Sequence, residues 1–212
     1  MKSVVIIDYG VGNLQSLKKA FTFLGVEPLV TEEADAVANA EAVVLPGVGS
    51  FEAGMRGLKL RGLCDAVKEH TAQNKPLLGI CLGAQLLLSR GYEFGVREGL
   101  GIIEGEVVRF PPLADNEKIP QVGWNTVWQP KGVSWSRTIF DSFANAEPDV
   151  YFVHSYILKP AESERVLGMT SYGGIEFCSA VRKGNIFGTQ FHPEKSGAAG
   201  LAILKNFIAL AL

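Results

Sequence analysis

Short apolar runs of strand length constrain the fold of this chain more than any other feature. Val4 to Asp8, Ala42 to Leu45 and Leu77 to Ile80 read as strands, and a helical pattern from Asn13 to Leu24 separates the first two. Strands that are apolar throughout are buried on both faces, because a strand with one wet face alternates apolar and polar residues. We therefore predict an α/β fold with a central, mostly parallel sheet that is flanked by helices.

The second half of the chain changes character, because its strand-like stretches are joined by hairpin turns such as Arg182-Lys183-Gly184-Asn185. We expect strands from Gly105 to Phe110, Asp149 to Leu158, Gly174 to Arg182 and Asn185 to Phe191, and a final helix from Gly200 to Leu210. They add antiparallel strands to the C-terminal half of the fold. With 212 residues, 47% of them hydrophobic, the chain can bury one large core, so we expect a single domain over residues 1–212.

Cys81 marks the most chemically informative turn. It follows the apolar strand Leu77 to Ile80, precedes a helical pattern, and has Gly79 and Gly83 on either side. A nucleophile elbow needs this arrangement, because side chains at the two flanking positions would collide with the strand and the helix. The first turn of a helix also offers free N–H groups that favour a thiolate. Cys81 is therefore a candidate nucleophile, although a buried apolar cysteine would show the same pattern.

A candidate base lies far downstream, where a strand-like stretch runs into His192 and Glu194. Alternation along an extended backbone would project both side chains from one side, so that Glu194 could orient the imidazole. The alternative is a histidine that merely ends a strand beside a proline. Together with the elbow, however, the pair completes a candidate cysteine, histidine and glutamate triad.

The segments Gly79-Ile80-Cys81-Leu82-Gly83-Ala84-Gln85 and Gln190-Phe191-His192-Pro193-Glu194 together resemble the class I, or triad, glutamine amidotransferases. The resemblance implies a Cys81 thiolate that attacks the side-chain amide of glutamine and releases ammonia. It also implies a glutamyl thioester that water hydrolyses, with His192 carrying the protons and Glu194 orienting it.

A glycine-rich turn, Pro46-Gly47-Val48-Gly49-Ser50, follows the strand Ala42 to Leu45. Backbone N–H groups in such a turn can face an oxyanion, and the elbow adds the N–H of Leu82. An ordinary strand-to-helix loop would look similar, but the turn resembles the oxyanion strand of the glutaminase subunits of imidazole glycerol phosphate synthases. The same subfamily is indicated by Asp8 to Leu14, Val122 to Asn125, Tyr151 to Tyr156 and His192 to Ser196.

The subfamily resemblance carries further expectations. It assigns Gly47, Val48 and Gly49 to the oxyanion, and Gln85, Glu93, Ser155 and Tyr156 to the glutamine substrate. It implies a (β/α)8 cyclase partner in a heterodimer, reached by an ammonia channel, that makes imidazole glycerol phosphate and an aminoimidazole carboxamide ribotide in histidine biosynthesis. By the same resemblance, the partner interface includes Asn13, Trp124, Tyr151 and Lys195.

One segment departs from the subfamily, because Gln121 and Val122 stand where a histidine and a methionine are usual before Gly-Trp-Asn. Two other functions stay open at this point. One is the glutaminase subunit of another triad amidotransferase, such as pyridoxal phosphate synthase. The other is a noncatalytic regulatory subunit, which would gain nothing from a reactive thiol.

Composition excludes several other classes. The net charge is −2 and no basic cluster is interleaved with aromatic residues, so nucleic acid is not an expected ligand. The three cysteines form no CxxC pair, and the start of the chain meets Asp8 too early for a signal peptide, so we expect a cytoplasmic protein with no membrane segment. Of the three histidines, His154 reads as structural, and we expect neither a metal nor a cofactor.

Overall fold

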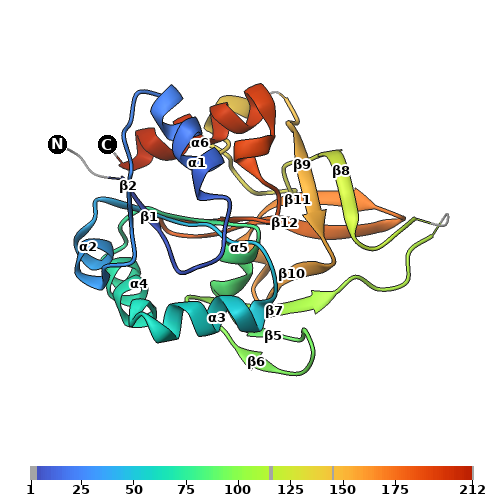
Figure 1. Cartoon of the computed structure of the whole chain (residues 1–212). Helices are drawn as coiled ribbons and strands as arrows, with labels where there is room; N and C mark the ends of the chain where they lie inside the picture. The colour runs from blue at the N-terminus through green and yellow to red at the C-terminus, as the bar shows by residue number, and fades with distance from the viewer. Residues whose placement is uncertain (1–3, 115–116, 145, 212) are drawn as a thin grey trace.

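The computed structural model describes residues 4–114, 117–144 and 146–211, and it contains one large mixed sheet between two layers of helices (Figure 1). The strands of this sheet follow the order β2-β1-β3-β4-β13-β12-β10-β7-β5-β6, with β11 paired to β12. The parallel part consists of β1 (Val4–Ile7), β2 (Leu29–Thr31), β3 (Ala42–Leu45), β4 (Leu77–Ile80) and β13 (Ile186–Thr189). The predicted α/β class is confirmed, and the apolar runs at β1, β3 and β4 are buried along their whole length.

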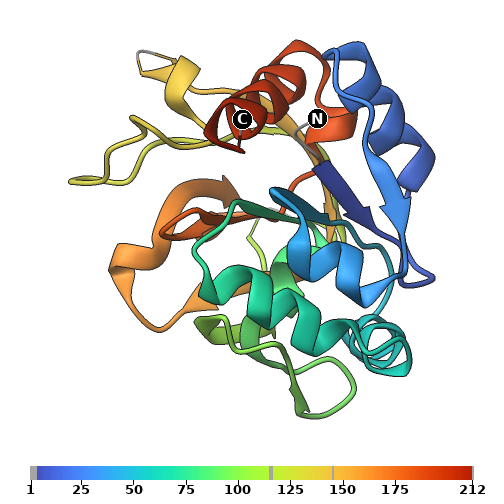
Figure 2. The ribbon, with the colours of Figure 1, turned by 90° about the vertical axis from the view of Figure 1, so that its left-hand side faces the viewer.

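The two helical layers cover opposite faces of this parallel part. On one face lie α1 (Leu14–Phe23) and α6 (Gly197–Ala211), and on the other α2 (Ala34–Asn39), α3 (Phe51–Leu60), α4 (Leu63–Ala72) and α5 (Leu82–Leu86) (Figure 2). Alternate residues of each strand therefore enter different cores. In β3, for example, Val43 and Leu45 pack toward α3 and α4, whereas Ala42 and Val44 pack toward α1 and α6.

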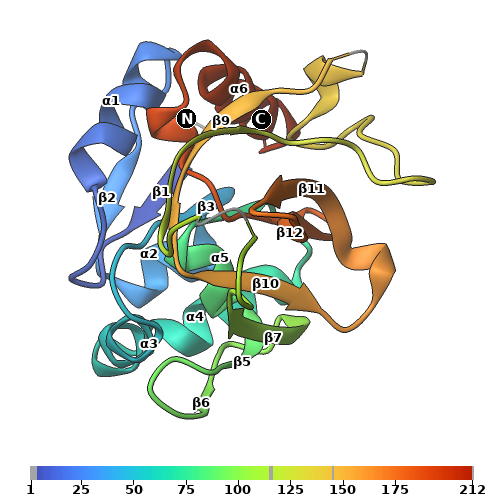
Figure 3. The ribbon, with the colours of Figure 1, turned by 90° about the vertical axis from the view of Figure 1, so that its right-hand side faces the viewer.

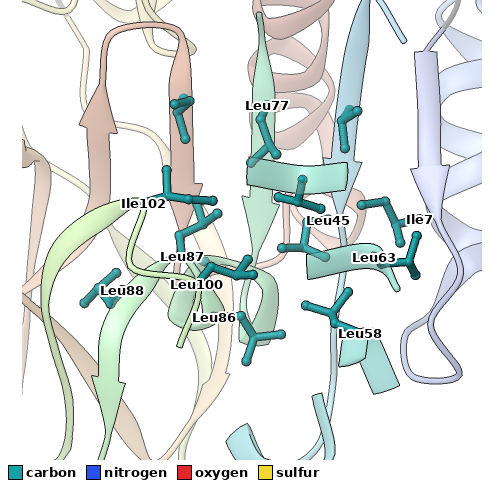
Figure 4. Packing of buried hydrophobic residues seen from close by; sticks show 14 of the residues in the cluster. Ile7, Leu45, Leu58, Leu63, Leu77, Leu86, Leu87, Leu88, Leu100 and Ile102 are labelled. Atoms are coloured by element: carbon teal, nitrogen blue, oxygen red, sulfur yellow. The ribbon is translucent and has the colours of Figure 1, made fainter. Parts of the chain in front are cut away.

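Branched side chains fill the core under α3, α4 and α5 (Figure 4). Leu58 and Leu63 come from the helices, Ile7 and Leu45 come from the strands, and all four are fully buried. Burying one such side chain contributes about 1.5–3 kcal/mol, so this layer holds the carboxyl ends of the strands firmly in place.

Antiparallel strands extend the sheet in the second half of the chain. They are β5 (Leu88–Gly91), β6 (Arg97–Glu98), β7 (Ile103–Arg109), β10 (Tyr156–Pro160), β11 (Val166–Tyr172) and β12 (Ile175–Lys183), of which β5 pairs with β7 in parallel. The predicted hairpin at Arg182-Lys183-Gly184-Asn185 is confirmed, because β12 and β13 pair antiparallel across it. Short 3₁₀ helices cover Asp141–Phe143, Ser163–Arg165 and Pro193–Lys195.

The single strand predicted from Asp149 to Leu158 is wrong. The chain forms β9 (Asp149–His154), which pairs only with β8 (Gln121–Thr126) in a separate two-stranded sheet, and then enters the large sheet as β10. Figure 3 shows the chain passing from β9, beside α6, into β10, beside β7. Ser155 stands at the crossing, and its carbonyl accepts a hydrogen bond of 3.0 Å from the N–H of Phe110. Burial stops alternating at Ser155, Tyr156 and Ile157, which are all partly buried, but the stretch contains no glycine or proline, so its sequence does not reveal the change of partner strand.

Candidate active site

Cys81 stands at a strained turn between β4 and α5. Its backbone has φ +53° and ψ −109°, a region that residues other than glycine rarely adopt. The N–H of Cys81 donates to Thr189 O at 2.7 Å, which ties the turn to β13. A Cβ at Gly79 would come within 2.9 Å of the Ala84 backbone, and one at Gly83 would overlap the carbonyl of Leu45. Both glycines are therefore required sterically, as the elbow predicts.

His192 and Glu194 meet through a short buried hydrogen bond. Nδ1 of His192 lies 2.8 Å from Oε1 of Glu194, and the two side chains are 2% and 4% exposed. The second oxygen of Glu194 and Nε2 of His192 have no hydrogen-bond partner among the described residues. Nδ1–H therefore donates to the carboxylate, which leaves Nε2 as the atom that can exchange a proton with Cys81.

The route to this contact differs from the predicted one. β13 ends at Thr189, and His192 caps the 3₁₀ helix Pro193–Lys195, so the two side chains do not project from an extended strand. A tight helical turn brings residues two apart together instead. Backbone bonds fix the histidine, because its N–H donates to Tyr151 O at 2.9 Å and its carbonyl accepts from Ser196 Oγ at 2.6 Å.

The charge of the His192 imidazole depends on its neighbours. Burial alone lowers the pKa of the His192 imidazole, but the neighbouring Cys81 sulfur and the hydrogen-bonded, negatively charged Glu194 outweigh burial and raise it from 6.5 to about 9. The imidazole is therefore protonated at neutral pH. A protonated base beside a cysteine can give a proton to a leaving amine, which suits acyl-transfer chemistry.

Cys81 and His192 line one cavity of about 350 Å³, and the residues predicted to bind substrate line it too. The residues predicted to bind substrate are Gln85, Glu93, Ser155 and Tyr156. Val48, Gly49 and Leu82, which were predicted for the oxyanion, line the same cavity, whereas Gly47 does not. Pro120, Val153 and His154 complete the wall and were not predicted to do so. A cavity of this volume holds a small polar molecule the size of an amino acid.

Two of these polar residues are also structural. Oε2 of Glu93 accepts the N–H of Phe51 at 2.7 Å and so caps the start of α3. Gln85 is buried on α5, one turn beyond Cys81, and its Nε2 lies 3.0 Å from Gln190 Oε1 and 3.4 Å from Tyr156 O. The sequence predicted a position for Gln85 near the thiol but gave no reason to select Gln190.

The turn after β3 is held from below by Tyr9. The buried hydroxyl of Tyr9 donates to Pro46 O, and a Cβ at Gly47 would overlap that hydroxyl. Burial, and then the negative charge of Cys81, raise the pKa of Tyr9 far above its ordinary range, so the phenol stays a donor. Gly47 borders a small void next to His192 and Glu194, Gly49 has φ +102°, and Val48 is partly exposed.

His154 is a satisfied histidine, although it reaches the cavity wall. Its Nδ1 lies 2.8 Å from Tyr156 O, and its Nε2 lies 3.0 Å from Oε1 of Gln121. A carbonyl can only accept, so Nδ1 carries the hydrogen of the neutral ring, and a flip of the Gln121 amide that exchanges Oε1 and Nε2 gives Nε2 of His154 the donor it needs. Burial lowers the pKa of His154 to about 4, which keeps the ring neutral. Gln121 is thus a buried partner of His154, whereas Val122 is exposed.

Three of the four residues predicted at the partner interface contact one another. The Trp124 and Tyr151 rings pack edge to face at 6.2 Å, and the Lys195 ammonium lies 5.9 Å above the Tyr151 ring. The Trp124 side chain is 59% exposed, although large aromatic side chains are usually buried. Asn13 instead caps α1 through the N–H of Ser16 at 3.4 Å and borders the small void beside the triad.

Among residues 4–114, 117–144 and 146–211, no cluster of three His, Cys, Asp or Glu side chains could hold a metal ion. Within the same residues, no helix combines the length and the apolar character needed to span a membrane. All three cysteines are free.

Comparisons with known proteins give the family of the chain. Residues 5–210 fit the family model for glutamine amidotransferase class-I. Imidazole glycerol phosphate synthase subunit HisH of Chlorobaculum tepidum is 46% identical over 204 residues, which are 96% of this chain and 98% of that protein. The HisH subunit of Lactococcus lactis subsp. lactis is 42% identical over 98% of each chain.

Two solved structures share the fold at low sequence identity. A glutamine amidotransferase superposes with a TM-score of 0.73 and 19% identity over 99% of each chain. A glutamine amidotransferase from Thermotoga maritima gives a TM-score of 0.65 and 15% identity, and covers all of this chain and 99% of that one. The chain therefore belongs to the class-I glutamine amidotransferase family. Within that family, its full-length relatives at 41–46% identity are HisH subunits of imidazole glycerol phosphate synthase.

Proposed function

We propose that this chain is the glutaminase subunit of an imidazole glycerol phosphate synthase. It hydrolyses glutamine to glutamate and ammonia and supplies the ammonia to a (β/α)8 cyclase subunit in histidine biosynthesis. The observation that carries the proposal is the triad itself, because Cys81 and His192 line one amino-acid-sized cavity and the buried Glu194 hydrogen-bonds His192. The near full-length similarity to HisH subunits supports the choice of acceptor.

In the first step, Cys81 Sγ attacks the side-chain carbonyl carbon of glutamine and the C–N bond breaks. His192, which is protonated at neutral pH, gives its proton from Nε2 to the leaving nitrogen, and ammonia departs. In the second step, the now neutral imidazole takes a proton from water, whose oxygen attacks the thioester. Glutamate leaves and the Cys81 sulfur is regenerated. Glu194 stabilises the imidazolium at each stage.

The developing oxyanion needs N–H donors beside Cys81. Leu82 opens α5, so its N–H lies at the positive end of that helix, and the Gly47-Val48-Gly49 turn lies across the cavity. We assign these groups to the oxyanion hole, and Gln85, Glu93, Ser155 and Tyr156 to the glutamine substrate. The Pro46 to Ser50 turn becomes aligned when partner and ligand dock, which keeps the isolated subunit latent.

The exposed face formed by Trp124, Tyr151 and Lys195, together with Asn13, is the proposed contact with the cyclase. Tryptophan and tyrosine are enriched at the centre of protein interfaces. Tyr151 links this face to the triad, because its carbonyl accepts the N–H of His192. A cyclase docked on this face therefore lies close to the triad that releases ammonia.

In the same proposal the whole chain acts as one glutamine amidotransferase domain in the cytoplasm. The chemistry needs no cofactor, because the protein supplies the nucleophile and the proton carrier. The three free cysteines agree with a reducing compartment.

The test is glutamate production by the purified chain, alone and with a cognate cyclase subunit and its ribotide ligand. Strong stimulation by the cyclase is expected, and Cys81→Ala should abolish glutamate release without loss of complex formation. Cys64→Ala is the matched control, since Cys64 lies on α4, outside the cavity. Glutamate production that the cyclase does not change would support a glutaminase but reject this cyclase as its partner. Inactivity in every mixture would favour a regulatory subunit.

The interface has its own test. Trp124→Ala should weaken cyclase binding at least tenfold, whereas Phe23→Ala should not, because Phe23 is an even more exposed aromatic at the opposite end of α1 from Asn13. Equal affinities of the two variants for the cyclase would show that the interface does not include Trp124.

A further inference from the structure

We infer that Gln190 is a positioning residue that holds the Cys81 sulfur and the Gln85 side chain in one hydrogen-bonded line. The inference deepens the proposed glutaminase function and rests on it for the role of Gln85 toward substrate. The action on Cys81 needs only the thiol, so it can be tested without any glutaminase activity.

Gln190 is placed with little freedom. It is fully buried, directly follows β13, and its N–H donates to Ser179 O at 2.9 Å, which continues the pairing with β12. Its side chain has two polar neighbours, Gln85 and Cys81. A buried amide is costly unless it is hydrogen-bonded, so these contacts decide how the group lies.

One backbone carbonyl fixes the direction of the whole line. Tyr156 O can only accept, so the Gln85 atom that lies 3.4 Å from it is the donor Nε2. The Gln190 atom that lies 3.0 Å from this donor must then be the acceptor Oε1. The remaining end of the Gln190 amide is Nε2, and it lies 3.8 Å from Cys81 Sγ. An N–H donor is thereby aimed at the sulfur.

This direction has two chemical consequences. A donor favours a charged acceptor over a neutral one, so the Gln190 amide stabilises the thiolate relative to the thiol at any pH. The same line occupies Nε2 of Gln85 with Gln190 and Tyr156 and leaves its Oε1 for the substrate. Gln190 therefore helps Gln85 present an acceptor to an amide or ammonium group.

The test is the pH dependence of Cys81 alkylation by iodoacetamide, followed on the Cys81 peptide by mass spectrometry without glutamine. Gln190→Met keeps the length of the side chain and removes the donor, and Gln190→Glu keeps the shape and presents only acceptors. We expect the pH of half-maximal alkylation to rise by about one in Gln190→Met and by more in Gln190→Glu. If Gln190 only fills space, the midpoint of a folded Gln190→Met protein will equal that of the wild type, and the inference fails.

A third variant covers the case in which both substitutions at Gln190 unfold the chain. Gln85→Leu removes the partner that orients Gln190, so the alkylation midpoint should rise in the same direction by a smaller amount. An unchanged midpoint there would also overturn the inference. A shifted midpoint in a chain that never hydrolyses glutamine would uphold the role of Gln190 on Cys81 and reject the proposed function.

Discussion

Replacement of Glu194 by glutamine isolates the charge of the carboxylate from its shape. Glu194→Gln keeps an oxygen near His192 Nδ1, at the position now 2.8 Å away, and removes the negative charge. A hydrogen bond to a charged group contributes about 1.5–3 kcal/mol, and 1.36 kcal/mol corresponds to one pKa unit. Because both side chains are buried, solvent screens this interaction little. We therefore expect the pKa of His192, about 9 in the wild type, to fall by about 1 to 2.

The assay is an NMR titration of the histidine rings, which is simple because the chain has three histidines. His70 serves as an internal reference, since burial lowers its pKa and neither His192 nor Glu194 contributes to that shift. Glutamine hydrolysis should fall by about 10- to 150-fold, the rate equivalent of the same free energy. An unchanged His192 pKa in the folded variant would refute the claim that Glu194 stabilises the imidazolium.

Three further predictions concern stability and substrate binding. Burial lowers the pKa of His154 below its unfolded value, so the unfolded state binds a proton at a higher pH than the folded state does. Between pH 6.5 and 4 the wild type should therefore lose roughly 3 kcal/mol of stability. Chemical denaturation of His154→Gln should not show this loss. Gly83→Ala places a Cβ against the β3 backbone and should lower the free energy of unfolding by more than about 3 kcal/mol. Gly132→Ala, which introduces only backbone strain, should lower it by about 1–2 kcal/mol, and equal melting temperatures of the two variants would contradict this prediction. Glu93→Gln keeps an acceptor for the N–H of Phe51 at the start of α3 but loses the negative charge. Its melting temperature should therefore stay unchanged while the KM for glutamine rises about tenfold or more. A lower melting temperature with an unchanged KM would show that Glu93 only caps α3.

The parallel half of the fold was predictable because its strands are buried on both faces. β3 and β4 begin and end where the apolar runs do, and α1 lies within one residue of its predicted bounds at each end. The break between β9 and β10 was not predictable, because the stretch from Asp149 to Leu158 contains no glycine or proline that would mark the change of partner strand. Pairing is a property of distant residues, and no local pattern records it.

Site residues were predictable where the chemistry needs a rare local geometry. Cys81 was detectable because two glycines must flank it, and Glu194 because it follows His192 closely, although a 3₁₀ turn and not a strand joins them. Gln190 and Gln121 were not detectable. A glutamine among apolar residues gives no sign of whether its amide meets a sulfur, an imidazole or water, and only the folded chain brings those groups together.

The hydrogen bond from His192 N–H to Tyr151 O uses only the backbone of residue 151, so the side chain there can vary while the position of His192 is kept. Any amino acid at position 151 supplies that carbonyl, so the anchor of the histidine does not depend on the ring that faces outward. The outer face can therefore be rewritten by mutation to suit a new docking surface while the geometry of proton transfer is inherited intact. Such an arrangement lets recognition and chemistry evolve at different speeds although a single peptide unit serves both.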